Sequence, residues 1–571
     1  MLSRIETGLR RCQRLFSRSE WLARLLKLSV STEPASKTGL VMLQIDGLSH
    51  NELKKALACG EMPFLQKLVD SEHYQLHSIY SGVPSTTPAA QGELFYGLKS
   101  VVPGFNFKPH DSDLLVRMFE PTAVTAVETH LQSQCQQALL ARGSCYADNF
   151  SGGAAEPHFC PSSLGWGNAL RDTRPLILLT LIVSHLYSFM RCIALILIEL
   201  VLAIVDFTRG LFVGNNFWAE LKFIPSRVLI VILLRELATI GVKIDVARGL
   251  PIIHANFLGY DEQAHRRGPT SLFAHWTLLG IDDAIARIWR AIQRASRRSY
   301  DLWIYSDHGQ EDVTPYQRAF STSFAEAACK IFKKHLDCDC DIDCQTTAGN
   351  GIQLERIRML GGKLTQTVFA RLLANLNHKP PPPPMQSSAC LSVASLGPVA
   401  QLYFNQPLTT FQLSTLARAL CIEAGVAAVL YLNSRGVIRV RRPRSEYNLH
   451  ENPAALVGTE HTWPDMVYED LKRLCTHPDA GVLIACGQYP ENADNSAMMS
   501  LSFALENGAH GGWSSAQIDA FALLPNDIAL QAQSGGCPRV MDLRHAVLDF
   551  LESRKTPDLK NSATSLAGIL E

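Results

Sequence analysis

Four segments far apart in the sequence share one pattern, in which a short apolar strand, or the end of one, is followed by small residues and by Asp or His. They are residues 44–47, 259–265, 305–309 and 508–512. Side chains from such distant segments meet only if the fold brings the ends of several strands together. Open α/β sheets do this, because functional groups gather at the carboxyl ends of their parallel strands. The pattern therefore predicts an α/β fold around a mostly parallel central sheet.

The sequence around these segments alternates between predicted strands and predicted helices. Residues 40–45 form an apolar strand, a helix is expected to follow through Val69, and another strand lies near Tyr80. Further along, apolar residues from Leu279 to Ile292 recur at helical spacing and are followed by a strand at 302–305. This alternation is typical of a parallel sheet that helices cover on both faces.

Changes in composition divide the 571 residues into a core, an apolar insertion and a smaller α/β portion. Five consecutive prolines at 380–384 indicate an exposed linker or loop. The predicted divisions are a basic amphipathic N-terminal segment at 1–37, the first part of the catalytic core at 38–378 with an apolar helical insertion near 170–245, a Pro-rich linker or loop at 379–386, an inserted α/β portion at 387–475, a return to the core at 476–550 and a polar tail at 551–571.

The charge of the chain is balanced, with 53 basic and 53 acidic residues. A balanced chain offers no bulk electrostatic attraction to a nucleic-acid polymer, so none is expected as a partner. The 15 cysteines are scattered without the spacing of a disulfide framework, and no apolar run follows the basic N-terminus as in a signal peptide. We therefore expect a cytoplasmic location, with the inner face of the membrane as one option.

The apolar insertion leaves membrane association open. Its two longest apolar runs, 176–190 and 192–205, are each shorter than the roughly 20 residues of a spanning helix. Because catalytic motifs on both sides of the insertion must meet in one site, any membrane crossings must be even in number. A membrane-lying or core-packed insertion is preferred, and a two-helix hairpin is the alternative. The basic N-terminal helix is expected either on an anionic membrane surface or against the protein body.

The four segments carry side chains suited to divalent metal ions. Three Asp and three His that converge at one sheet edge could hold two ions about 4 Å apart, an arrangement suited to displacement at phosphorus. Asp and His ligands suit zinc best, with manganese as the alternative. Thr87, followed by Pro88, is predicted at the start of a helix, where free N–H groups favour a bound phosphoryl group. Metal coordination would activate its hydroxyl as a nucleophile.

The order of these motifs resembles the type I phosphodiesterase/nucleotide pyrophosphatase family of the alkaline phosphatase superfamily. That family has an Asp after the first strand, a P-S-x-T turn, D-x-x-x-H, D-H-G after a strand, and a late H-G, and all five occur in order between residues 40 and 515. The resemblance implies an alkaline-phosphatase-like fold. It assigns one metal to Asp261, His265 and His510, the second to Asp46, Asp307, His308 and Thr87, the nucleophile to Thr87 with Thr86 as the neighbouring alternative, and a phosphate-oxygen contact to Asn106.

The predicted function is therefore hydrolysis of a phosphodiester or nucleotide pyrophosphate through a covalent phospho-enzyme. A sulfatase is disfavoured because the C/S-x-P-x-R turn of those enzymes is missing. The alternatives are a lipid head-group phosphotransferase or a phosphomonoesterase of the same superfamily, or a membrane-associated scaffold with an inactive catalytic domain. The motifs leave the natural phosphoester substrate and the oligomeric state open.

Overall fold

The computed structural model describes residues 18–32, 37–71, 73–163, 227–336, 344–346, 390–491, 499–532 and 536–553, together with residues 186, 190, 193–198, 201, 204 and 208. The predicted Pro-rich linker at 379–386 lies outside these residues, as do most of the N-terminal segment, the apolar insertion and the C-terminal tail. The predicted domain boundaries stay a prediction.

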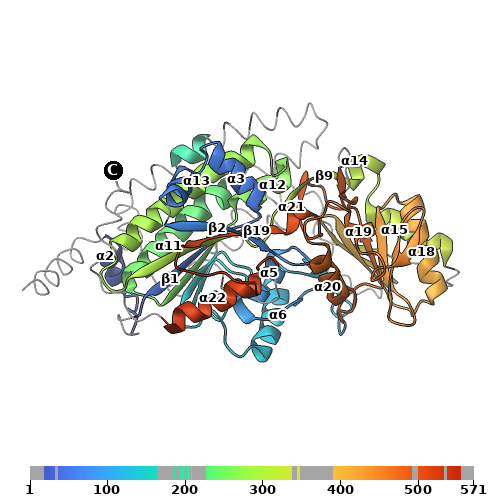
Figure 1. The fold of residues 1–571 in the computed structure, drawn as a ribbon, viewed down its shortest axis with the longest axis horizontal. Helices are drawn as coiled ribbons and strands as arrows, with labels where there is room; N and C mark the ends of the chain where they lie inside the picture. The colour runs from blue at the N-terminus through green and yellow to red at the C-terminus, as the bar shows by residue number, and fades with distance from the viewer. Residues whose placement is uncertain are drawn as a thin grey trace, which may run out of the picture.

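A seven-stranded sheet forms the centre of the molecule (Figure 1). In spatial order its strands are β2 (Tyr74–Tyr80), β19 (Asp519–Pro525), β8 (Tyr300–Tyr305), β1 (Gly39–Ile45), β7 (Ile252–Phe257), β5 (Ser144–Tyr146) and β6 (Glu156–His158). The five strands from β8 to β6 run parallel, and β19 is antiparallel to both of its neighbours. The predicted α/β class with a mostly parallel sheet is confirmed.

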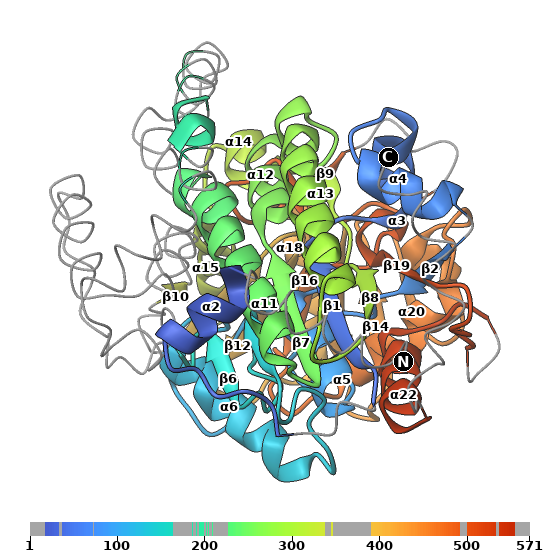
Figure 2. The same cartoon turned by 90° about the vertical axis from the view of Figure 1, so that its left-hand side faces the viewer.

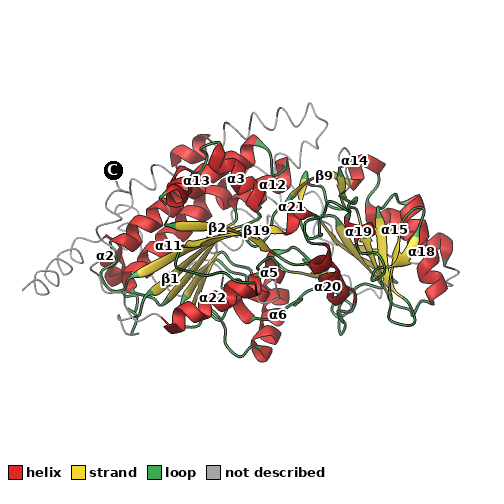
Figure 3. Cartoon of the chain, in the orientation of Figure 1, coloured by secondary structure: helices red, strands yellow, loops and turns green. Residues whose placement is uncertain are grey.

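Helices cover both faces of this sheet (Figure 3). The covering helices are α11 (Arg235–Arg248) and α13 (Leu272–Gln293) on one face, and α5 (Thr87–Tyr96), α6 (Pro121–Gln134) and α22 (Val540–Ser553) on the other. Along β1, Val41 and Leu43 pack into the first layer while Leu40 and Met42 pack into the second. A strand buried on both faces favours apolar residues on each face, which explains the apolar run from Leu40 to Leu43 in β1.

Two details of the predicted helices differ from the structure. The helix expected to reach Val69 is two helices, α3 (His50–Ala58) and α4 (Pro63–Asp70). Gly60 between them has a φ of +72°, which favours glycine, and Pro63 begins the second helix because proline suits the first helical turn. In α13 the buried stripe includes Ile281 and Ile285, whereas Leu279, predicted in the same stripe, is exposed.

A second, mostly antiparallel sheet lies beside the central one, at the right of Figure 1. Its strands, in spatial order, are β10 (Cys344–Thr346), β11 (Leu391–Leu396), β12 (Val399–Phe404), β16 (Leu483–Cys486), β13 (Ala428–Leu432), β14 (Ile438–Arg441) and β15 (Glu446–Asn448). Helices α15 (Phe324–His335) and α18 (Thr410–Glu423) pack on one face. The other face meets α20 (Pro464–Cys475) together with Tyr80 and Trp513, so the two sheets share a buried contact.

The N-terminal helix α2 (Arg18–Leu25) packs against the body of the protein. Its Leu22 and Ala23 are buried against Ile240 and Ile244 of α11. Among the described residues, no helix combines the length and the apolar character that crossing a bilayer requires.

Arg248, at the end of α11, is a buried cation that joins three segments. It is 1% exposed, its Nη1 lies 2.7 Å from Asp245 Oδ1, its Nη2 pairs with Glu156 of β6, and its Nε donates to Ser29 O at 2.8 Å. Removing one partner of a buried ion pair leaves the other charge without compensation.

We therefore predict that Arg248→Met lowers the free energy of unfolding by about 3–5 kcal/mol, measured by urea denaturation. The matched control is Lys334→Met, which removes a solvent-exposed pair with Glu423 and should cost about 1 kcal/mol or less. Equal losses in the two variants would contradict a structural role for the buried guanidinium.

Candidate metal centre

The parallel strands β1, β7 and β8 end at the same level, which places their following residues together. Gln44 of β1 pairs with Asn256 of β7 on one side and with Tyr305 of β8 on the other. Two residues beyond this row, Asp46 follows β1 and Asp307 follows β8. After β7 the chain turns into α12 (Gly259–Arg267), which carries Asp261 and His265.

Two other elements add to this edge. A small sheet pairs β18 (Gly508–Ala509) with β9 (Glu311–Pro315), and this brings His510, directly after β18, to the segment that follows Asp307 and His308. Helix α5 begins at Thr87 and points its first residue at the same place. The fold thus gathers seven of the eight predicted site residues.

Asp46, Asp307 and His308 form the first group, with Thr87 beside them. One ligand atom from each of the three lies within 4.8 Å of the others, and all three side chains are buried. His308 Nε2 is 3.3 Å from Asp307 Oδ2 and 3.7 Å from Asp46 Oδ1. The Thr87 hydroxyl donates to Asp46 Oδ1 at 3.4 Å and lies 3.3 Å from His308 Nε2.

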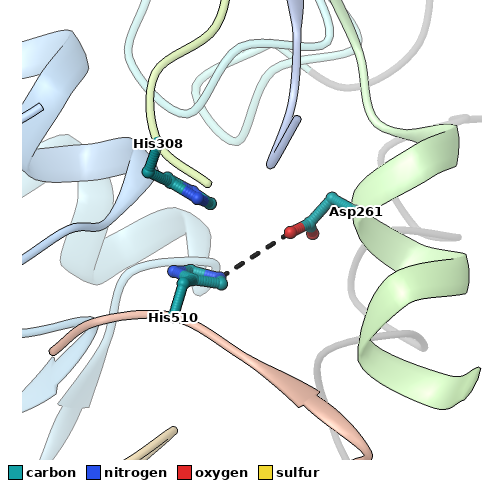
Figure 4. Close-up of side chains that lie close together, drawn as sticks. All are labelled: Asp261, His308 and His510. Carbon is teal, nitrogen blue, oxygen red and sulfur yellow. Dashed lines mark ion pairs between the residues drawn. The ribbon is translucent and has the colours of Figure 1, made fainter. Parts of the chain in front are cut away.

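Asp261, His308 and His510 form the second group, and their side chains point toward one another in Figure 4. His510 Nε2 lies 3.7 Å from Asp261 Oδ1 and 3.1 Å from His265 Nε2, and His265 Nε2 lies 3.4 Å from the same Asp261 oxygen. The rings of His308 and His510 stack at 3.9 Å. His265 therefore borders this group, and His308 belongs to both groups.

The three histidines present the same nitrogen to the cluster. In each, Nδ1 faces an oxygen outside the cluster; the partners are Ser85 O for His510 at 2.9 Å, Gly309 O for His308 at 3.1 Å and Glu506 Oε2 for His265 at 3.0 Å. A neutral imidazole that donates through Nδ1 keeps a free lone pair on Nε2. This is the orientation that metal-binding histidines take in proteins.

Burial and neighbouring charges change the pKa values of three side chains in the cluster. Burial raises the pKa of Asp307 to about 7, and the charge of Asp261 adds to this rise. Burial also lowers the pKa of His510 well below its usual value, with His308 and His265 contributing. For His265, burial lowers the pKa, but the carboxylates of Asp261 and Glu506 outweigh it and raise the pKa well above its usual value. Asp307 Oδ2 is buried and accepts no hydrogen bond. Buried carboxylates and Nε2 lone pairs on one small volume suit a divalent cation.

Glycine is required where two of these segments approach each other. Gly47, directly after Asp46, has a φ of +72°, and a Cβ there would lie 2.9 Å from Asp261 Oδ1. Its N–H also donates to Asp307 Oδ1 at 3.3 Å. A side chain at this position would be strained and would press on the carboxylate.

Thr87 is the first residue of α5, and Thr86 is the residue that precedes the helix. The helix starts at Thr87 as the sequence predicts, although the capping residue is Thr86 rather than Thr87. The Thr86 hydroxyl is buried without a hydrogen-bond partner, whereas the Thr87 hydroxyl contacts the first group. Asn106 is the eighth predicted residue, and its Nδ2 donates to Ser395 O in β11 at 3.1 Å.

Sequence reasoning missed several side chains that orient the cluster. Asn256 Nδ2 donates to Asp46 Oδ2 at 2.7 Å, Gln310 Nε2 donates to Asp261 Oδ1 at 2.6 Å, and Glu506 holds His265. Gln310 follows the D-H-G motif directly, so its place next to a predicted ligand was the one signal available. Asn256 and Glu506 have no local pattern that marks them.

A buried polar network lies beneath the cluster and was also missed. Gln91, one turn after Thr87 in α5, donates to Gln44 of β1 at 3.2 Å and to Asp148 at 3.0 Å. His254 of β7 lies 2.8 Å from Asp148 Oδ2 and 2.7 Å from the Tyr305 hydroxyl. Every member is buried, so the network ties the helix that carries Thr87 to three strands of the sheet.

The comparisons indicate a phosphoester hydrolase, and the cluster offers side chains that suit metal ions. Residues 252–360 match the family model described as type I phosphodiesterase / nucleotide pyrophosphatase, which confirms the resemblance that the motifs carry. The matched stretch contains Asp261, His265, Asp307 and His308.

Solved structures similar to the chain include two complexes of phosphonoacetate hydrolase from Sinorhizobium meliloti 1021. The complex with phosphonoformate has 11% identity and a TM-score of 0.41, and the complex with phosphonoacetate has 10% identity and a TM-score of 0.42. Both alignments cover 92% of this chain and 99% of the other. No curated protein matches the chain at a significant level.

The geometry predicts how ligand substitutions change the bound metal. Asp307→Asn should lower the metal content by about one ion per chain, and His308→Ala should lower it further than His265→Ala, because His308 belongs to both groups. The measurement is metal content by mass spectrometry after dialysis. His450→Ala, at an exposed position paired with Glu451, is the control. Equal metal content in His308→Ala and His450→Ala would rule out the proposed ligand set.

Proposed function

We propose that the protein hydrolyses phosphodiesters or nucleotide pyrophosphates through Thr87 as the nucleophile, with a phosphothreonine intermediate. The observation that supports this most is the position of the Thr87 hydroxyl, 3.4 Å from Asp46 Oδ1 and 3.3 Å from His308 Nε2, at the start of a buried helix. A hydroxyl that served only the helix would not need to face a carboxylate and an imidazole of a metal-compatible cluster.

Two divalent ions are proposed as cofactors. The residues that would hold them are Asp46, Asp307 and His308 with Thr87 for one, and Asp261, His265 and His510 for the other, with His308 close to both. Zinc is preferred because the donors are imidazole nitrogens and carboxylates, and manganese is the alternative. When bound, such a pair of ions supplies positive charge to the attacking and leaving oxygens of an in-line displacement.

The first step would join Thr87 to the substrate. Oγ1 attacks phosphorus, the bond from phosphorus to the leaving alkoxide breaks, and the alkoxide takes a proton from solvent. The threonine proton passes to solvent as the new bond forms, because Asp46 and His308, which face the hydroxyl, are proposed to hold an ion. The N-terminus of α5 adds N–H groups and a partial positive charge that favour the phosphoryl oxygens. Asn106 remains the proposed contact for one of these oxygens.

The second step would release the product. Water attacks the phosphothreonine from the opposite side, the bond between phosphorus and Thr87 Oγ1 breaks, and the hydroxyl regains a proton. The network around Gln91 would keep Thr87 in place through both steps, because it ties α5 to β1 one turn below the nucleophile.

We expect a preference for diesters, because the sequence lacks the groups that bind the dianion of a phosphomonoester. No third-metal motif and no phosphate-binding Arg of the alkaline phosphatase kind was found near the motifs, so the dianion of a monoester gains little here. We predict that the metal-loaded enzyme hydrolyses bis-p-nitrophenyl phosphate faster than p-nitrophenyl phosphate, measured by release of nitrophenol. A preference for the monoester by about tenfold would favour the phosphomonoesterase alternative.

The nucleophile is tested by two neighbouring substitutions. Thr87→Ala should abolish turnover of the diester while metal content and folding stay near those of the wild type, because only the attacking oxygen is removed. Thr86→Ala is the matched control and should keep substantial activity, since its hydroxyl makes no hydrogen bond. The opposite outcome, with Thr86→Ala inactive and Thr87→Ala active, would show that the assigned register is wrong.

A further inference from the structure

A stripe of apolar side chains is exposed along the helical part of the insertion. Each of its six residues is helical and between 50% and 61% exposed, and they follow one another at spacings of three or four; they are Leu186, Met190, Ile193, Leu197, Val201 and Ile204. Residues with this spacing lie on one face of a helix. We name this face the apolar stripe. In Figure 2 the segment is drawn in teal at one edge of the molecule.

The opposite side of the same segment is also apolar. Leu195 and Ile196 pack against Val231 and Ile232, which belong to the π-helix η1 (Arg227–Leu234). A surface helix of a soluble protein normally carries polar residues on its outer face, whereas a helix that is apolar on both sides is covered on both. The apolar stripe therefore has the composition of a surface that another molecule covers. Exposed apolar patches of this kind mark interaction sites.

Charged and aromatic side chains beside the apolar stripe indicate the nature of that occupant. Helix α2 packs on α11, which continues from η1, and Figure 2 shows α2 on the same edge of the molecule as the teal segment. α2 and the turn after it expose Trp21, Arg24 and Lys27, and Arg297 at the end of α13 joins this region through Glu20. A second copy of the chain would bring the same cations face to face. An anionic bilayer instead attracts the cations, accepts the apolar side chains and suits tryptophan at its interface.

The apolar stripe is connected to the candidate metal centre by direct packing. Val231 of η1 lies against the start of α12, where a Cβ on Gly259 would approach Val231 Cγ1 to 3.4 Å. Two residues further, α12 carries Asp261, and one turn later it carries His265, whose side chain is 21% exposed at the rim of the cluster. A bilayer on the apolar stripe would thus lie one packed element away from the helix that holds metal-compatible side chains.

We propose that the apolar stripe and the basic face of α2 dock the enzyme on an anionic lipid bilayer, and that its substrate is a phosphodiester carried by a lipid in that bilayer. The substrate part rests on the proposed phosphodiesterase function, whereas the docking part stands on the surface alone. Docking would place α12 one packed element from the membrane, so that a lipid phosphodiester has a short path to the cluster.

The test uses the full-length, metal-loaded protein and vesicles of phosphatidylcholine with or without phosphatidylglycerol. The wild type should sediment with the mixed vesicles, and Leu197→Glu combined with Val201→Glu should weaken this binding by about tenfold or more. Arg24→Glu with Lys27→Glu should weaken binding to the mixed vesicles and leave binding to pure phosphatidylcholine unchanged. Phe411→Glu, at an exposed apolar position on α18 outside the stripe, is the control and should bind as the wild type does.

Three outcomes would overturn the docking proposal. In the first, the wild type remains in the supernatant with both kinds of vesicle. In the second, the stripe variant sediments as the wild type does. In the third, analytical ultracentrifugation shows a dimer that the stripe substitutions abolish, because a second copy would then cover the surface.

Measuring two activities distinguishes the proposed lipid substrate from the phosphodiesterase function on which it rests. Release of the head group from phosphatidylglycerol in vesicles should fall about tenfold in the stripe variant, while hydrolysis of soluble bis-p-nitrophenyl phosphate stays unchanged. A wild type that cleaves the soluble diester but no vesicle lipid would refute the lipid substrate alone. A wild type that binds vesicles but cleaves neither would refute the phosphodiesterase function and leave the docking surface intact.

Discussion

The parallel pairing of β1 with β7 and β8 is the constraint on which the rest of the structure depends. Because Gln44 sits in one row with Asn256 and Tyr305, the three strands end together and their next residues share one small volume. A slip of one residue in either pairing would exchange the two faces of a strand and move the residues after it out of line with their partners. The same register that buries Val41 and Leu43 in one layer therefore also sets Asp46 and Asp307 side by side.

Gathering three carboxylates and three imidazoles in a buried site is unfavourable unless their charges are compensated. Hydrogen bonds from the surrounding chain offset part of this cost, because Asn256 and Gln310 donate to carboxylates of the cluster. Oxygen atoms next to Nδ1 of each histidine orient the ring so that Nε2 faces the cluster. The pKa of Asp307 is raised and that of His510 is lowered, so both groups are less charged than they would be in water. Such local disagreement with folding rules is expected at functional sites, where stability is given up for chemistry.

Site residues could be predicted from the sequence where the pattern that marks them lies within a few residues along the chain. Asp46 comes directly after β1, and the pair Asp307–His308 begins two residues after the last residue of β8, so finding the strands located these residues. The break between α3 and α4 was missed although Gly60 and Pro63 are local signals, because the apolar pattern continues across them. Asn256 and Glu506 could not be found, since each acts through a contact with a residue far away in the chain.

By itself, the amino-acid sequence determined the α/β class, the strand ends that carry Asp and His, and the helix that begins near Thr87, because these depend on periodicity and on neighbours within a few residues. Only the tertiary structure decided that His308 lies in both metal-compatible groups, that His265 stands at the rim, and that an exposed apolar face packs through η1 toward α12. These relations depend on distances between segments hundreds of residues apart, and such distances are set by the packing of whole elements rather than by any local pattern.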